Sequence, residues 1–320
     1  MPTLESPPSP AMKLRFLPIL LPLLAAPVFA DTFGSGANQF EIGFVGIGNP
    51  GNPADTSGRG AVAYKYRMGV NEVSRGMIDA YNALGGGPAI TLSDMSALGG
   101  NGANRPATGV SWNEAARFVN WMNTSRGFSE AYKFTTGGAN DNVVPWAVGD
   151  AGYNASNPFR NANAYYYIPD LNEWYKAAYY DPNAAGGAGA YWDFATGSNT
   201  APTAVAGGTA SGTAVYGQSF SAGPADITNA GGLSPFGTMG QNGNVHEWTE
   251  SYSINSGEYW RAYTGGTWSM SASVLATTTL NTAATSDSSS RGFRVAAVPE
   301  PSGVLMALLG LMAAVMRRKR

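Results

Sequence analysis

Two apolar segments, one near each end of the chain, limit which residues can form a globular domain. The first spans residues 16–29 and follows Lys13 and Arg15, and the second spans residues 303–316 and precedes four basic residues, 317–320. As a helix the second segment is about 21 Å long, which is short against a hydrocarbon core of about 30 Å. It is therefore a poor permanent membrane span, and its basic end is expected to stay in the cytoplasm. Everything upstream is predicted to lie across the membrane.

The N-terminal segment has the order of a secretory signal peptide. Val28 and Ala30 supply small residues at the −3 and −1 positions, so cleavage is predicted before Asp31. Residues 1–11 are polar and Pro-rich and do not suit a signal peptide, so Met12 is an alternative start. A buried core helix is the other interpretation, but the basic front and the small-residue exit favour a signal peptide. Residues 1–30 are thus assigned to an N-terminal extension and signal peptide.

Pro299, Glu300 and Pro301 precede the second apolar segment, with one residue, Ser302, between them and it. The order Pro-Glu-Pro, short apolar run and basic cluster resembles the PEP-CTERM sorting signal. The resemblance implies transient membrane insertion and cutting near these residues by an exosortase-type enzyme, much as a GPI signal loses its hydrophobic tail. An ordinary C-terminal transmembrane helix acting as a tail anchor is the alternative. Residues 31–298 are then the mature domain and residues 299–320 the sorting tail.

These signals predict a location. The protein is expected to be exported across the inner membrane. It would be secreted or held at the cell surface once the tail is removed, and membrane-anchored if the tail is kept.

Composition excludes several classes of function. The chain has no Cys and a single His, His246, which excludes disulfides, thiol catalysis and a conventional zinc site with two His ligands. It carries 19 Lys and Arg against 21 Asp and Glu, and the basic residues cluster only at the two ends. Nucleic acid is not an expected partner, because phosphate binding needs clustered Lys and Arg. The 42 Gly residues predict a domain rich in loops.

Capping signals locate the predicted helices. Ser111 with Glu114, and Asp170 with Glu173, fit capping boxes, and Ser74 can cap a third helix that runs to about residue 84. Apolar residues follow each cap at helical spacing. Strands are predicted over residues 40–47 and 63–70, and surface loops over residues 186–212 and 281–290.

Four segments in a fixed order resemble the formylglycine-generating enzyme (sulfatase-modifying factor) family. They are GVSWNEAARFVNWMN at 109–123, YIPDLNEWYKAA at 167–178, GNVHEWTE at 243–250, and GGTW at 265–268 followed by RGFRV at 291–295. The resemblance covers roughly residues 40–297. It implies a single α+β domain related to C-type lectins, loop-rich with little regular secondary structure.

The family's chemistry does not transfer to this chain. Formylglycine generation uses two thiols that bind copper and activate oxygen, and the matching positions here are Met270 and Leu275. Neither side chain can be a thiolate or a tight copper ligand, so no copper is expected. The sulfoxide-synthase relatives need several His for iron, and this chain has one. A non-catalytic role is therefore favoured, with no catalytic residue assigned.

Calcium is the metal that the resemblance implies. In the family, the segment matching residues 243–247 helps to bind a structural Ca²⁺, through the carbonyls of Gly243 and Val245 and the carboxylate of Glu247. Carbonyl and carboxylate oxygens are the ligands that Ca²⁺ prefers. One departure weakens the match, because the side-chain ligand expected a few residues earlier falls at Gly240; Asn242 or Asn244 is a candidate replacement.

Other interpretations of this segment stay open. Glu247 could instead pair with Arg291 or Arg294. His246 is interpreted as an orienting or packing residue, because a catalytic base needs a nearby reacting group. Glu247 and Glu250 do not establish a glycosidase pair, which needs two carboxyls across a cleft.

The leading hypothesis is an exported, non-catalytic recognition domain for glycan or protein at the cell surface or in the extracellular matrix. Expected partners are an exosortase-type enzyme at the tail and an exopolysaccharide or a surface protein. The alternative is a divergent oxidoreductase of the same family that acts on an exported substrate. A purely structural matrix component is a third possibility.

Overall fold

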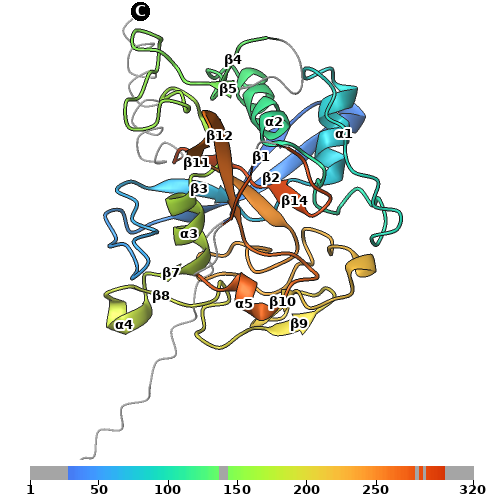
Figure 1. Ribbon diagram of the computed structural model, residues 1–320, viewed down its shortest axis with the longest axis vertical. Helices are drawn as coiled ribbons and strands as arrows, with labels where there is room; N and C mark the ends of the chain where they lie inside the picture. Colours follow the sequence, from blue (N-terminus) through green and yellow to red (C-terminus); the bar gives the residue numbers. More distant parts are fainter. Residues whose placement is uncertain (1–27, 137–142, 278–280, 284–285, 300–320) are drawn as a thin grey trace, which may run out of the picture.

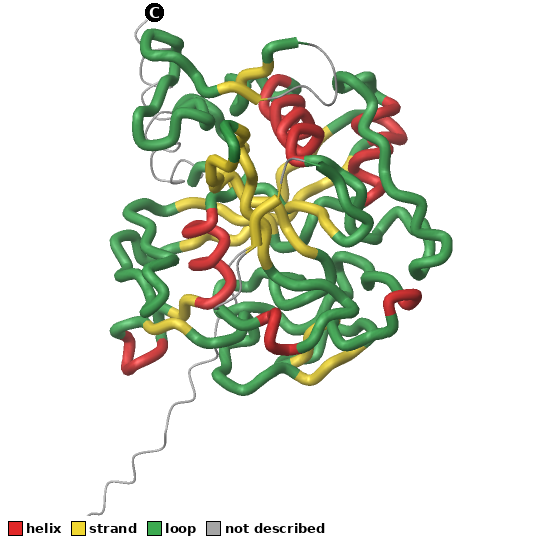
Figure 2. Tube along the Cα trace, viewed as in Figure 1, coloured by secondary structure: helices red, strands yellow, loops and turns green. Residues whose placement is uncertain are grey.

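The computed structural model describes residues 28–136, 143–277, 281–283 and 286–299, and short regular elements alternate with long loops throughout (Figures 1 and 2). The predicted sorting tail beyond Pro299, and residues 1–27 of the predicted signal peptide, lie outside these residues. No helix within the described ranges is long and apolar enough to cross a membrane. The helices are α1 (Arg75–Ala83), α2 (Trp112–Thr124), α3 (Leu171–Tyr179), α4 (Ala184–Gly187), α5 (Ala272–Leu275), η1 (Gly36–Asn38) and η2 (Phe220–Ala222).

Two larger sheets form the framework, and three two-stranded ladders flank them. The five-stranded sheet has the order β1-β2-β3-β15-β6, and the four-stranded sheet has the order β13-β12-β11-β14. The strands are β1 (Val28–Phe33), β2 (Phe40–Ile47), β3 (Tyr66–Gly69), β4 (Lys133–Phe134), β5 (Val143–Val144), β6 (Tyr166–Tyr167), β7 (Tyr180–Asp181), β8 (Ala190–Tyr191), β9 (Thr203–Val205), β10 (Thr213–Val215), β11 (His246–Asn255), β12 (Glu258–Thr264), β13 (Asn281–Ala283), β14 (Arg291–Phe293) and β15 (Ala296–Ala297).

The five-stranded sheet is covered on both faces. Along β2, Ile42 and Phe44 face the main apolar cluster, which includes residues of α1 and α2. Val45 and Ile47 face the opposite way, into a cluster that contains Ala177 of α3. Successive strand residues point to opposite faces, so one strand supplies both layers. In Figure 1, α1 and α2 accordingly lie on one side of β2 and α3 on the other.

The capping signals predicted the three longest helices, α1, α2 and α3, correctly. Ser111 and Glu114 form a capping box at the start of α2, and Asp170 and Glu173 form one at the start of α3. Ser74 caps α1 as expected. Each helix buries its apolar stripe, so local polar contacts fix where the helix begins and burial fixes which way it faces.

Several strand and loop predictions need correction. The strand predicted over 63–70 is confined to Tyr66–Gly69. The segment 281–290 was predicted as a loop, yet Asn281–Ala283 pairs with β12. The segment 186–212 is mostly loop but contains β8 and β9. In each case tertiary pairing, which local composition does not report, decides the outcome.

Asparagine side chains hold loops together where strands are short. Asn120 Oδ1 accepts from the backbone N–H groups of Ala131 and Tyr132, and its Nδ2 donates to the carbonyl of Tyr132. Asn123 does the same for Tyr165 and Tyr166. A buried carboxamide therefore replaces a neighbouring strand as hydrogen-bond partner. We call Asn120 and Asn123 the bracket asparagines.

Candidate functional site

The segment that resembles the family's calcium loop leads into β11 at the centre of the domain. Gly243 has a φ of 95°, and a Cβ there would lie 2.2 Å from the carbonyl oxygen of Val215, so only glycine fits. Asn244 also has positive φ, at 57°. The turn places Glu247 in the first rungs of the four-stranded sheet, opposite Thr264 of β12 and beside β14.

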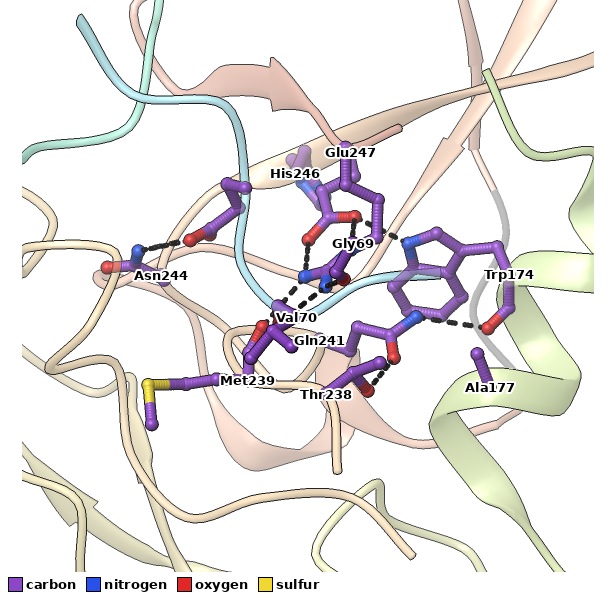
Figure 3. A network of polar contacts seen from close by, with 12 residues as sticks. Gly69, Val70, Trp174, Ala177, Thr238, Met239, Gln241, Asn244, His246 and Glu247 are labelled. Atoms are coloured by element: carbon purple, nitrogen blue, oxygen red, sulfur yellow. Dashed lines mark hydrogen bonds and ion pairs between the residues drawn. The ribbon is translucent and has the colours of Figure 1, made fainter. Parts of the chain in front are cut away.

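Glu247 forms a fully buried ion pair with Arg294 (Figure 3). Nη2 of Arg294 lies 2.5 Å from Oε1 of Glu247, and Nε lies 2.5 Å from Oε2. The remaining guanidinium donors reach the carbonyls of Gly69, Val70 and Met239 at 2.8–3.1 Å. Burying two charges is costly, and good bidentate geometry with satisfied donors is what offsets that cost. Of the two arginines that the sequence offered, Arg294 is the partner.

The pair is tied to α3 by further contacts (Figure 3). Trp174 Nε1 donates to Oε2 of Glu247 at 2.7 Å. Gln241 Nε2 donates to the carbonyl of Trp174 at 3.0 Å, and Thr238 donates to Gln241 Oε1. The network therefore joins β11, the connection between β14 and β15, and helix α3. These buried contacts hold the fold together.

A second carboxyl group, Glu72, lies beside this network. Both of its oxygens accept from Asn244 Nδ2, at 3.0 and 3.1 Å. Burial, together with the nearby Glu247 carboxylate, raises the pKa of Glu72 to about 8, although Arg294 and the hydrogen bond from Asn244 act in the opposite direction. At neutral pH the Glu72 carboxyl therefore stays largely protonated, and one guanidinium balances one carboxylate in the cluster.

His246 packs inside the domain. It is 4% exposed, and its ring makes an edge contact with Tyr263 at 5.0 Å. The backbone N–H of Gly266 donates to Nδ1 at 3.2 Å, and the carbonyl oxygen of Thr264 lies 3.4 Å from the same nitrogen. Burial lowers the pKa of His246 to about 4, so the ring is neutral at physiological pH.

The three residues predicted to bind calcium, Gly243, Val245 and Glu247, are neighbours, but the Glu247 carboxylate is already bound. Arg294 and Trp174 occupy both of its oxygens, and a cation there would have to displace them. Within the described part of the chain, no group of three or more His, Cys, Asp or Glu could hold a metal ion. The calcium assignment stays a prediction.

Asn242 offers a different ligand beside this segment. Its side-chain oxygen and nitrogen are both buried without a hydrogen-bond partner among the described residues. A cation at this turn would therefore have to use the Asn242 oxygen and backbone carbonyls in place of the Glu247 carboxylate.

Glu250 belongs to a separate buried cluster. Its Oε2 accepts from Arg160 Nε at 2.8 Å and from Asn157 at 2.5 Å. Arg160 also pairs with Glu173 of α3 at 2.8 Å. Glu247 and Glu250 thus serve different arginines and are not an acid–base pair across a cleft.

The positions matching the family's thiols lie at and before α5. Leu275 is fully buried, and its backbone carbonyl accepts from Tyr179 at 3.0 Å. A Cβ at Gly266 would lie 2.6 Å from Leu275 Cδ2, so this side chain fills the space beneath the Gly265–Gly266 turn. Met270 is partly buried. Leu275 packs as a core residue.

The sequence profile of the sulfatase-modifying factor enzyme 1-like domain matches residues 70–298, more than two thirds of the chain. The chain belongs to this family. Among solved structures, the chain is similar to Treponema denticola variable protein 1, with a TM-score of 0.56 and 20% identity over 84% of this chain and 99% of that one. It is also similar to CarF, with a TM-score of 0.55 and 20% identity over 81% and 99%. No curated protein sequence matches significantly. The expected α+β fold of this family is confirmed.

Sequence reasoning missed four side chains of the central network, namely Glu72, Trp174, Gln241 and Thr238. Glu72 follows β3 with no motif of its own, and its partner Asn244 lies 172 residues away. Trp174 was expected only to pack, yet its indole N–H also orients Glu247. For Trp174 a signal existed, because a buried indole N–H usually finds an acceptor.

Proposed function

We propose that this protein is an exported, non-catalytic member of its family that binds glycan at the cell surface or in the extracellular matrix. The observation that carries the proposal is the replacement of both family thiols. Leu275 is a fully buried core residue, and the chain has no Cys anywhere. Oxygen activation at a thiol-bound copper has no ligands here.

The location follows from the two ends of the sequence. A signal peptide over residues 1–30 and a PEP-CTERM-like tail over 299–320 would deliver residues 31–298 to the outside of the inner membrane. The tail would be inserted transiently and then cut by an exosortase-type enzyme near Pro299–Pro301.

A polar cavity beside α2 supports glycan as the ligand. Its volume is about 350 Å³, and Arg117, Trp121, Thr124, Glu130 and Phe134 are among its lining residues. The guanidinium of Arg117 lies 3.9 Å over the Phe134 ring. Cavities of this size hold small ligands, and charged groups, a hydroxyl and aromatic walls together suit a polyhydroxyl ligand.

Co-sedimentation with the host's own exopolysaccharide tests the proposal. Residues 31–298 are expected to bind saturably, and Glu130→Gln is expected to weaken binding about tenfold, or about 1.4 kcal/mol, as loss of a charged hydrogen-bond acceptor should. Glu258→Gln, an exposed carboxylate at the tip of the β11–β12 hairpin, is the matched control.

The outcomes separate the candidates. Binding that depends on calcium would point to residues 243–247. No binding with calcium or with chelator would contradict glycan recognition and favour a protein partner. Copper or iron in the purified protein would favour the oxidoreductase alternative.

A further inference from the structure

The two flanks of the domain leave the five-stranded sheet at the same end. β1 enters with Val28 opposite Val45, three residues before Asp31 pairs with Ile42. The last residue of β15, Ala297, pairs with Arg67 of β3. The chain then continues toward the level at which Ile47 of β2 pairs with Tyr66 of β3. Because β2 pairs with β1 and with β3, and β3 pairs with β15, the register alone places the start of β1 and the end of β15 at the same end of the sheet's strands.

Arg67 joins these two flanks directly. Its Nη2 lies 2.8 Å from Oδ2 of Asp31, and its Nε donates to the carbonyl of Val298 at 3.1 Å. The backbone N–H of Val298 also donates to the carbonyl of Tyr165 at 2.9 Å. Arg67 is 3% exposed, so this contact lies inside the fold. The predicted cleavage point before Asp31 and the start of the predicted sorting tail after Val298 are thus held together.

The surface around this junction carries aromatic and basic side chains. Phe128 is 36% exposed and stacks on Tyr165 with ring centroids 4.5 Å apart. The side chain of Arg126 is 37% exposed and lies 3.8 Å from Asp31. Tyrosine and arginine favour the headgroup layer of a bilayer, and phenylalanine enters the boundary between headgroups and acyl chains.

The sequence leaves little chain between this surface and the apolar segments. The first segment, residues 16–29, runs into β1 itself. The second begins at Gly303, four residues beyond Pro299. Four residues span at most about 14 Å when fully extended. If either segment is inserted, the junction cannot lie far from the membrane surface.

We propose that the surface formed by Arg126, Phe128 and Tyr165 contacts the lipid headgroups while the C-terminal segment is in the membrane. This inference rests on the export and sorting signals of the proposed function. Arg126 would face lipid phosphates and Phe128 would enter the interfacial layer. The domain would then be held in one orientation before its tail is cut, with the junction at Pro299 turned toward a processing enzyme in the membrane.

The absence of Cys allows a clean test, because a single introduced thiol is the only labelling site. Ser129→Cys places a probe beside Phe128, and Ser211→Cys is a control in the exposed loop between β9 and β10. In Figure 1 these two strands lie on the opposite side of the molecule from α2 and β4, the elements that precede and follow residue 129 in the chain. Each full-length variant carries an environment-sensitive dye and is mixed with vesicles of phosphatidylcholine and phosphatidylglycerol that contain a headgroup quencher.

Flotation is measured first and quenching second. The full chain is expected to float with the vesicles, and the dye at residue 129 is expected to be quenched several-fold more than the dye at residue 211. Flotation with equal quenching at both positions would overturn the headgroup contact and leave the sorting tail intact. A full chain that does not float would overturn both the headgroup contact and the inserted sorting tail, because the contact requires an inserted tail.

Discussion

Glu72 gives the sharpest prediction, because its carboxyl group is buried beside an existing ion pair. Replacing it by Gln in residues 31–298 keeps the size of the side chain and one acceptor for Asn244 Nδ2, and it removes the titration. The pKa of Glu72 is raised to about 8 in the folded state, against an ordinary value of 4.5. The variant is therefore expected to change how stability depends on pH.

The sign follows from which state binds the proton. Below about pH 4.5 Glu72 is protonated in the folded and in the unfolded state, so its contribution to stability does not change with pH. Between about pH 4.5 and about pH 8 the folded protein keeps a proton that the unfolded chain has lost, so the Glu72 contribution to stability falls as pH rises. The slope is about 1.4 kcal/mol per pH unit at most, up to about 5 kcal/mol over the window.

Urea unfolding at pH 5, 6, 7 and 8 measures this difference. The free energy of unfolding of Glu72→Gln, minus that of the unmodified protein, is expected to rise steadily across the series. Taking the difference cancels the other titrating groups, and Glu258→Gln at an exposed site should give a flat difference. Parallel curves for Glu72→Gln and the unmodified protein would refute the assignment of a protonated Glu72.

Three further outcomes are expected. Arg294→Met should destabilise the fold by about 3–5 kcal/mol, because the buried Glu247 carboxylate loses its counter-charge. Glu247→Gln should cost less, because Glu72 can then ionise and pair with Arg294. Equal losses of unfolding free energy for the two variants in urea would contradict this coupling. The neutral, buried His246 ring contributes fully to the stability of the fold above about pH 6.5, and this contribution is lost as pH falls toward about 4, because the unfolded chain binds the proton first. His246→Phe should therefore flatten the acid side of the curve of stability against pH. An unchanged acid side would exclude a neutral buried ring. If calcium binds, a chelator should lower the melting midpoint of residues 31–298, and an unchanged midpoint would remove the metal from the account.

Local signals were enough to predict the three longest helices but neither the short helices nor the second sheet. Ser111 and Asp170 mark α2 and α3 because a cap acts on residues three positions away. The β11–β12 hairpin was missed, although the Ser256–Gly257 pair between two strands rich in Tyr, Trp and Thr is a recognisable turn signal.

The central network was only partly predictable. The sequence offered Arg291 and Arg294 as partners for Glu247, and nothing local separates them, since the choice depends on how β14 pairs with β11. The contact between Arg67 and Val298 spans 231 positions and had no sequence signal. Such contacts depend on the register of strands that are far apart in the chain.

The bracket asparagines have a consequence for how long the protein lasts. At both positions the carboxamide nitrogen donates to a carbonyl and the oxygen receives two backbone N–H groups. Asparagine is among the thermolabile residues, and loss of its amide would put a buried carboxylate oxygen against the carbonyl of Tyr132 or Tyr166. No disulfide is present to hold the loops afterwards. If the domain is exported as we propose, no new synthesis in place would replace a copy that had been damaged at either of these amides.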